Sequence, residues 1–311
     1  MPKLTLVPTW LDIRAVVSQR ANEFVAQLRA VRDGGADGVH DARVASRQLR
    51  ELLPMMAGDP RSTDAQGIVT KAGRALGTVR DLDVMIDVLD RKNAVVPAAA
   101  LAIASARRTL STRADGERRS LIKTLEQLEL DRVRALKQAP TLTRVVTLDP
   151  IRRRVQWLPI LRDRIRLRAD RLRAAVDHAT GVYFPNRLHA VRVATKKLRY
   201  TVEAAVDLHA WKPPHMLKDL KKIQATLGEL HDAQLLRDRL DRLIDICVPQ
   251  QETTTLIAAL DADIVRLHAE YMQRRDRLDA ITVACRRYSA HEPPAHATLR
   301  SALRLVQRRA S

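Results

Sequence analysis

Two eleven-residue segments of the sequence repeat one pattern of histidine and basic residues. His40 to Arg50 reads HDARVASRQLR, and His189 to Arg199 reads HAVRVATKKLR. Residues three or four apart lie on one face of an α-helix. The pattern therefore predicts two helices, each with one histidine and three cations on one face and small or apolar residues opposite. These two stripes consist of His40, Arg43, Arg47 and Arg50 in the first segment and His189, Arg192, Lys196 and Arg199 in the second.

The composition of the stripes favours a phosphate-rich anion as their ligand. Guanidinium groups bind phosphate oxygens in bidentate fashion and stay charged at any relevant pH. Like charges one helical turn apart repel each other, and a multivalent anion would relieve that repulsion. The alternative is a solvated basic face without a ligand, but such a face gives no reason for the histidine to recur at the same place.

A second pair of matching segments follows the stripes at nearly the same distance. Leu76 to Asp81 reads LGTVRD, and Leu227 to Asp232 reads LGELHD. We expect Asp81 and Asp232 to orient a cation of the site from behind, as supporting residues do in other binding sites. The alternative is that each forms an ordinary ion pair within or between helices.

The helices that carry these later segments supply glycines and further cations. Gly77 and Gly228 each cost about 1 kcal/mol inside a helix, which predicts a close approach between neighbouring helices. The additional cations expected at the site are Lys71 and Arg74 in the first half and Lys197, Lys218, Lys221 and Lys222 in the second.

The rest of the sequence is predicted to be helical as well. Glycine is scarce at 10 residues and aromatic residues make up only 3%, whereas Ala, Leu and Arg dominate, so an all-α fold is expected. The expected helices cover 9–32, 39–57, 62–92, 97–138 (as one helix or a broken pair), 151–178, 185–210, 214–247 and 251–288.

The order of these helices indicates an internal duplication. Four helices, a linker between Pro140 and Pro150, and four further helices accompany the two pairs of matching segments. The expected halves are 1–140 and 150–290, each forming a helical bundle, and a basic tail covers 291–311.

The overall charge of the chain also favours an anionic ligand. The 311 residues include 55 Lys and Arg against 36 Asp and Glu, a formal net charge of +19. The arginine-rich segment 151–173 and the tail residues 297–309 could extend the site, although a solvated outer face is the preferred interpretation of 151–173. The N-terminus has no signal-peptide pattern, and no stretch reaches the roughly 18 apolar residues of a membrane span, so a cytoplasmic protein is expected.

Together these motifs resemble the CHAD family, the conserved-histidine α-helical domain. The resemblance rests on the repeated H-x-x-R-V-A-[ST]-[RK]-x-L-R helix, the LGTVRDLDV segment and LRYTVE at Leu198 to Glu203, and it covers about 9–290. It implies two tandem, pseudo-symmetric four-helix bundles around a basic central cavity or groove. It also implies binding of inorganic polyphosphate by the two stripes, with Lys197 and the third-helix cations as additions, and association with polyphosphate granules. Gln48 departs from the family pattern, where a second consecutive cation is common.

An enzymatic function is the less favoured interpretation. His40-Asp41 and His231-Asp232 resemble dipeptides of helical metal phosphohydrolases, but the neighbouring cations would repel a metal. CHAD domains often accompany a triphosphate-tunnel domain with an E-x-E-x-K strand, and this sequence contains no such motif. We therefore expect a stand-alone, non-catalytic CHAD protein with no metal, cofactor or catalytic residue.

Nucleic-acid binding is the main alternative, since the same cations attract any phosphate backbone. The few aromatic residues do not interleave with the stripes, so base stacking is not expected and nucleic acid should bind more weakly. The stripe histidines predict tighter polyanion binding as the pH falls through ~6.5, the ordinary pKa of histidine. The preferred chain length and the oligomeric state stay open.

Overall fold

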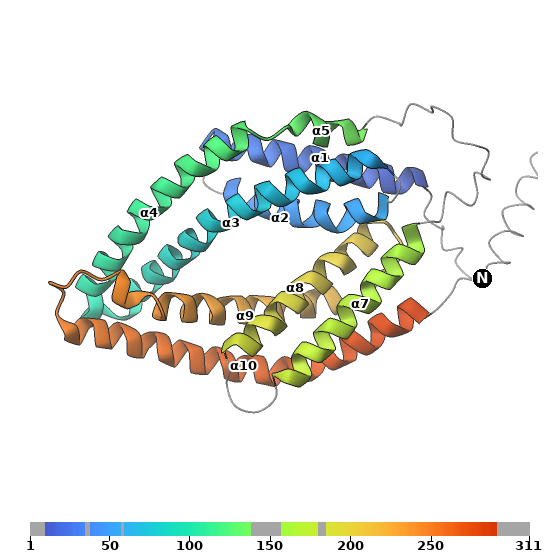
Figure 1. Ribbon diagram of the computed structural model, residues 1–311. Coiled ribbons are helices and arrows are strands. Elements are labelled where there is room, and N and C mark those ends of the chain that lie inside the picture. The colour runs from blue at the N-terminus through green and yellow to red at the C-terminus, as the bar shows by residue number, and fades with distance from the viewer. Residues whose placement is uncertain (1–9, 35–37, 57–58, 138–156, 180–184, 291–311) are drawn as a thin grey trace, which may run out of the picture.

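All regular structure in the described ranges is helical, which confirms the predicted all-α class (Figure 1). The computed structural model describes residues 10–34, 38–56, 59–137, 157–179 and 185–290. The helices of the first half are α1 (Trp10–Arg32), α2 (Gly38–Leu52), α3 (Pro60–Val95), α4 (Ala100–Glu126) and α5 (Leu130–Arg134). Those of the second half are α7 (Trp157–His178), α8 (Pro185–Asp207), α9 (Met216–Arg237) and α10 (Gln250–Ala290).

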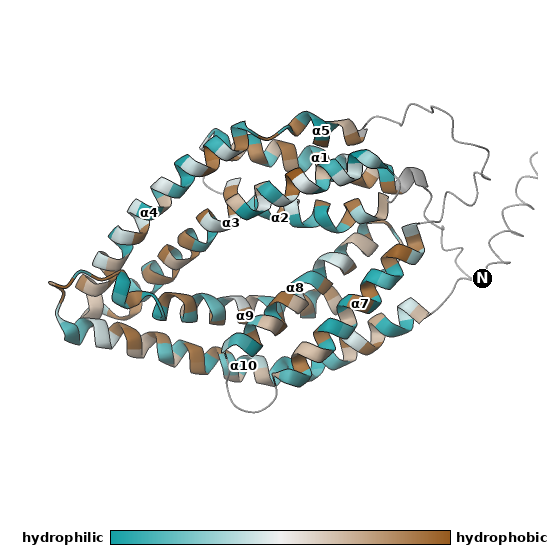
Figure 2. Cartoon of the chain, viewed as in Figure 1, coloured by the Kyte–Doolittle hydropathy of each residue, from teal (hydrophilic) through white to brown (hydrophobic). Residues whose placement is uncertain are grey.

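The two helices that carry the stripes bury the face opposite the cations. Helix α2 buries Ala42, Ala45 and Leu49, and α8 buries Val191, Thr195 and Leu198. These residues recur every three or four positions, the spacing of one helix face. Brown hydrophobic and teal hydrophilic bands alternate along the helices in the same way (Figure 2). The sequence pattern therefore sets which side of each helix the cations occupy.

The two halves meet at the helices that carry the matching segments. Helix α2 contacts α8, and α3 contacts α9, so equivalent helices face each other. One core cluster runs through both halves and includes Phe24 and Leu49 from the first and Leu198 and Tyr271 from the second. Arg20 of α1 also forms an ion pair of 2.6 Å with Asp207 of α8. The halves are thus joined by packing and by charge.

The far end of the molecule mixes helices of both halves in a second core. This cluster combines the end of α3, the start of α4, the end of α9 and the start of α10, with Leu89, Ile103, Leu236 and Leu256 among its buried residues. The four helices converge at the left of Figure 1. The two halves of the chain therefore also share this second core, which forms because α3 and α10 are long enough to reach past their own halves.

Two expected helices end more than three residues earlier in the structure, whereas 97–138 forms the broken pair α4 and α5, one of the two predicted alternatives. Helix α2 ends at Leu52 and is followed by a 3-10 turn, Leu53–Met56. Helix α9 ends at Arg237 instead of 247, because hydroxyl groups of α4 bind the backbone beyond it. Thr109 donates to the carbonyl of Leu243 at 2.9 Å, and Ser105 accepts from the amide of Asp245 at 2.9 Å.

Two sequence-based expectations lie outside the described ranges. These are the first part of the arginine-rich segment, 151–156, and the basic tail, 297–309. No helix in the described part of the chain is both long enough and apolar enough to cross a membrane.

Candidate functional site

A basic groove of about 430 Å³ lies where α2 and α3 of the first half face α8 of the second. We call it the central groove. Six of the cations predicted from the sequence line it, together with Arg168 of α7. Two of the six, Arg43 and Lys196, approach from opposite helices. The charged and polar residues that line it are Arg43, Ser46, Arg47, Arg50, Glu51, Arg74, Thr78, Asp81, Arg168, Lys196, Lys197 and Tyr200.

Two equivalent guanidinium–carboxylate pairs, one in each half of the chain, lie near each other at the cluster of cations. Arg43 lies 3.4 Å from Asp81, and Arg192 lies 3.9 Å from Asp232. Burial raises the pKa of Asp232, and nearby Asp81 adds to this effect. Burial is also the main cause that lowers the pKa of Arg43 and of Arg192, and Arg47 contributes to both shifts. The carboxylates thus hold two of the predicted site arginines, while the cations crowd one another.

Lys196 is the group whose ionisation the central groove alters most clearly. Burial is the largest cause, followed by the positive charges of Arg47, Arg192 and Arg43, and together they lower the pKa of Lys196 to about 7. Asp81 opposes the shift and is the weakest of the five contributions. An ammonium ion surrounded by guanidinium groups is disfavoured unless an anion neutralises them.

Tyr200 connects the stripes of the two halves. Arg47 of α2 donates a hydrogen bond of 3.4 Å to the Tyr200 hydroxyl, and the guanidinium of Arg199 lies 4.2 Å from the centre of the Tyr200 ring. Arg199 itself is held by Glu203 at 2.8 Å and by Gln224 at 2.7 Å. Its charge is therefore paired inside the protein, and Arg199 does not line the central groove, unlike its counterpart Arg50.

A buried carboxylate brings α7 to the central groove. Glu51 is 8% exposed and binds Arg164 at 2.5 Å and Arg168 at 3.4 Å, and it accepts a hydrogen bond of 3.2 Å from Thr201. The solvated outer face expected for these arginines is therefore wrong, because Glu51 of α2 draws both side chains inward. Of the two, Arg168 lines the central groove.

A pair of histidines lies beside the cluster of cations. The Nδ1 atoms of His189 and His231 are 3.4 Å apart, and the ring centres are 4.6 Å apart. Burial and the positive charge of Arg192 lower both pKa values, that of His231 to about 4. In the free protein the pKa of His189 therefore lies below its ordinary value, because burial and the cationic neighbours disfavour a further positive charge. The predicted pH dependence of polyanion binding stays a prediction. The equivalent of His231 in the first half is Arg80, so the histidine pair is not duplicated.

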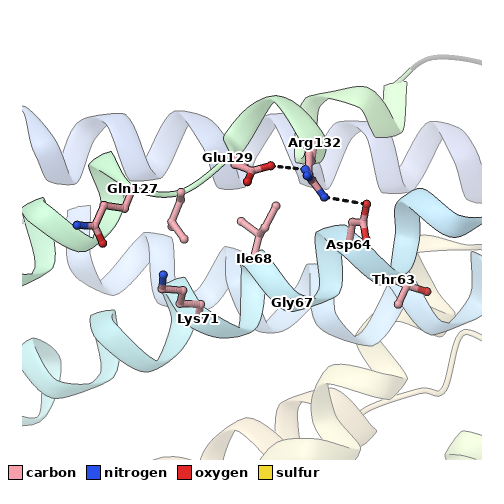
Figure 3. A pocket seen from close by; sticks show the side chains of 9 residues that line it. Thr63, Asp64, Gly67, Ile68, Lys71, Gln127, Glu129 and Arg132 are labelled. Atoms are coloured by element: carbon pink, nitrogen blue, oxygen red, sulfur yellow. Dashed lines mark hydrogen bonds and ion pairs between the residues drawn. The ribbon is translucent and has the colours of Figure 1, made fainter.

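Several predicted site residues lie away from the central groove. Lys71 lines a separate pocket of about 410 Å³ between α3 and α5, beside Ile68 and opposite Gln127 (Figure 3). There Arg132 bridges Glu129 and Asp64. The predicted site residues that are exposed on their helices and do not line the central groove are His40, His189, Lys218, Lys221 and Lys222.

The two mid-helix glycines have different surroundings. A Cβ atom on Gly77 would lie 2.8 Å from Nη1 of Arg43, whereas one on Gly228 would meet nothing within 4 Å. A Cβ on Gly73 would lie 3.1 Å from the hydroxyl of Ser46. The expected close approach of a neighbouring helix is therefore wrong at Gly228, whereas at Gly77 the Arg43 side chain of α2 approaches closely and occupies the space that glycine leaves.

Four groups that shape the site were not assigned to it from the sequence. They are Glu51, Arg168, Tyr200 and His231. Tyr200 and His231 lie within segments that were already singled out, LRYTVE and LGELHD, which was an available signal. No comparable sequence signal marked Glu51, because a single acidic residue after a basic stripe is typical of an exposed helix position. Within the described residues, no group of three or more His, Cys, Asp and Glu side chains is arranged to hold a metal ion.

Comparison with known proteins identifies relatives of the chain in sequence and in fold. The CHAD domain family model matches residues 15–241. The chain is similar to the CHAD domain from the plant Ricinus communis, with a TM-score of 0.53, 21% identity, and coverage of 88% of this chain and 90% of that one. It is also similar to PptA from Streptomyces chartreusis, with a TM-score of 0.52, 17% identity, and coverage of 86% of this chain and 99% of that one.

An uncharacterized protein of Mycobacterium tuberculosis, found in two strains, is 27% identical over 252 residues. The match covers 73% of this chain and 44% of the relative, so the chain spans less than half of that protein's length. The two similar solved structures support the fold, and the family model covers the residues that line the central groove. The chain therefore belongs to the CHAD domain family.

Proposed function

We propose that the central groove binds inorganic polyphosphate and holds it without cleaving it. The observation that carries the proposal is the convergence of Arg43, Arg47, Arg192 and Lys196 from two facing helices, with the pKa of Lys196 lowered to about 7. Such crowding raises the free energy of the empty groove. A bound polyanion would neutralise these charges and favour the protonated form of Lys196.

One buried donor at this centre lacks a partner among the described residues. Nη1 of Arg43 is shielded from solvent and makes no hydrogen bond there. An unsatisfied buried donor costs about 1–3 kcal/mol, which adds to the free energy of the empty groove. The other nitrogen of the fork, Nη2, faces Asp81 at 3.4 Å, so the guanidinium is already oriented.

The length of the cationic surface suits a chain of phosphates better than a single one. Arg50, Arg74, Arg168 and Lys197 continue the charge outward from the centre along the same groove. Each contact with a phosphate contributes about 1.5–3 kcal/mol where it is partly desolvated. Binding by many such contacts releases counterions, so affinity should fall steeply as salt increases.

The test compares polyanions under one condition and removes two central cations. Long-chain polyphosphate, duplex DNA and single-stranded RNA are titrated at about 0.15 M salt against the wild type and Arg47→Ala/Lys196→Ala. The control Arg119→Ala/Lys123→Ala removes one arginine and one lysine from exposed positions of α4. We expect polyphosphate to bind more tightly than either nucleic acid, and the groove variant to lose about 100-fold or more in affinity.

Two other results would contradict the proposal. Equal losses in the groove variant and the α4 control would mean that the net charge alone attracts polyanions. Tighter binding of DNA or RNA, unaffected by the groove variant, would favour a nucleic-acid interface elsewhere on the protein.

The absence of cleavage and the cellular location are separate parts of the proposal. Incubation of polyphosphate with the protein, with and without Mg²⁺, should leave its chain length and the concentration of free phosphate unchanged. A fluorescent fusion in the cytoplasm should gather on polyphosphate granules, and Arg47→Ala/Lys196→Ala should disperse it. Release of phosphate at a rate proportional to enzyme concentration would make the protein a hydrolase instead.

A further inference from the structure

We propose that Lys196 is an acylation site for acyl phosphates, and that its acylation weakens the binding of polyanions in the central groove. Acyl phosphates are small molecules with a carbonyl carbon joined through oxygen to a phosphate group. The acylation step itself does not require the binding of polyphosphate. Its effect on polyanions rests on the function proposed above.

The position of Lys196 places an amine among phosphate-binding groups. It follows Arg192 by one turn of α8 and lines the central groove opposite Arg43 and Arg47 of α2. No carboxylate in the described part of the chain lies within ion-pair distance of its Nζ atom. A phosphate drawn to these three guanidinium groups would therefore come to rest beside a lysine amine.

The amine at this position is also reactive, because a large fraction of it is uncharged. With a pKa of about 7, more than half of the Lys196 side chains carry a free lone pair at pH 7.5. For a lysine of ordinary pKa the uncharged fraction at that pH is on the order of one in a thousand. The neutral amine is the form that attacks carbonyl carbon.

Three further ionisable groups interact with Lys196. Asp81 of α3 favours the ammonium form weakly, while His189 of α8 and His231 of α9 interact with Lys196 from the side of the histidine pair. Both histidines have pKa values below the ordinary one, so they are largely uncharged at pH 7.5 and leave the reactive state of the amine unchanged.

The reaction needs no group beyond the acyl phosphate itself. The Nζ lone pair attacks the carbonyl carbon and forms a C–N bond, and the C–O bond to the phosphate breaks. The phosphate leaves with the bonding electron pair, and the attacking nitrogen loses one proton to water. The products are an amide on Lys196 and inorganic phosphate. Arg43, Arg47 and Arg192 would stabilise the negative charge that grows on the leaving phosphate.

The amide would weaken the binding of polyanions in the central groove. It removes the ability of Lys196 to carry a positive charge and adds an acyl group to the space that Arg43 and Arg47 face. A polyanion would then lose one contact and part of its access to the neighbouring arginines. Conversely, a bound polyanion would cover the guanidinium groups and favour the unreactive ammonium form, so the two processes would exclude each other.

The experiment treats the full-length protein with acetyl phosphate and measures the occupancy of individual lysines by peptide mass spectrometry. Lys222, which is exposed on α9 and lies outside the central groove, is the control. We expect Lys196 to react at least about tenfold faster than Lys222 at pH 7.5. Its rate should level off above pH 7, whereas that of Lys222 should continue to rise with pH.

Two comparisons separate phosphate-directed acylation from mere exposure of a reactive amine. An acetyl ester of N-hydroxysuccinimide has no phosphate, so its preference for Lys196 over Lys222 should be smaller than that of acetyl phosphate. Arg47→Ala should slow the reaction at Lys196 with acetyl phosphate, and Arg119→Ala, which removes an exposed arginine of α4, should not. Retained helicity and thermal unfolding temperature establish that each variant is folded.

The outcomes distinguish this inference from the proposed function. Equal acetylation of Lys196 and Lys222 by acetyl phosphate would overturn the acylation site, whatever the protein binds. If Lys196 is acetylated selectively but polyphosphate affinity is unchanged, the regulatory consequence is wrong and the acylation site stands. If wild-type protein binds no polyphosphate, the proposed function fails while the acylation rates remain interpretable.

Discussion

The guanidinium of Arg43 occupies space that Gly77 leaves free, with Nη1 only 2.8 Å from the point where a Cβ atom would lie. The same guanidinium faces Asp81 one turn further along α3. The equivalent glycine in the second half, Gly228, has open surroundings. The two glycines therefore provide a matched pair, one that positions a central cation and one that does not.

Gly77→Ala should displace the Arg43 side chain and weaken polyphosphate binding by about tenfold, the equivalent of one charge-assisted contact. Gly228→Ala should leave affinity unchanged and raise helix stability by up to about 1 kcal/mol, since alanine favours the helix. Titration with polyphosphate and urea unfolding of both variants measure the two effects. Equal effects of the two substitutions on affinity would mean that the position of Arg43 is unimportant.

Lys71 and Arg74 are neighbours on α3 that the structure separates. Arg74 lines the central groove, whereas Lys71 lines the pocket between α3 and α5. Arg74→Ala should therefore weaken polyphosphate binding several-fold and reduce its dependence on salt by about one phosphate contact. Lys71→Ala removes the same charge about 60° further around the helix, in the pocket between α3 and α5, and should change neither quantity. The opposite ranking would place the ligand in the pocket of Figure 3.

The sequence predicted best those features that depend on one helix alone. The stripes containing Arg43, Arg47, Arg192 and Lys196 follow from the helical repeat, because the apolar residues opposite them must face a core. The position of Lys71 could also have been predicted. At 100° per residue it lies about 120° around α3 from Gly77, outside the face that meets α2, whereas Arg74 lies about 60° away.

Features that depend on contacts between helices could not be predicted in this way. Arg199 has the same spacing as the other stripe residues, yet Glu203 and Gln224 withdraw its charge from the groove. Arg168 belongs to a helix rich in arginine, and its position in the site depends on its contact with the buried Glu51 of another helix. The mixed core at the far end likewise depends on how far the long helices extend, which local periodicity does not show.

Glu51 is expected to contribute to stability as well as to the shape of the site. Removal of one partner from a buried ion pair leaves uncompensated charge and costs about 3–5 kcal/mol. Glu51→Ala should approach that loss, because Arg164, Arg168 and Thr201 all bind the carboxylate. Asp64→Ala removes a partner of Arg132 at an exposed ion pair and should cost less than about 1 kcal/mol. Urea unfolding at pH 7 measures both, and similar small losses would show that Glu51 is solvated in solution.

Lys196 should make the free energy of unfolding depend on pH above neutrality. Its pKa is about 7 in the folded protein, compared with roughly 10.4 for a lysine in an unfolded chain. Between these values the unfolded chain binds more protons than the folded one, so the folded state gains stability as the pH rises. Below pH 7 both states hold the proton, and the unfavourable burial of the charge is then present in full.

Lys196→Met should therefore be more stable than the wild type at pH 6–7, and this advantage should shrink as the pH approaches 10. Lys222→Met, at an exposed position of α9, should show no such trend relative to the wild type. Urea midpoints for the three proteins at several pH values between 6 and 9.5 provide the comparison, since the difference between variants cancels the titration of all other groups. Parallel curves for the wild type and Lys196→Met would mean that Lys196 keeps its proton throughout this range, and the neutral amine required for acylation would then be absent.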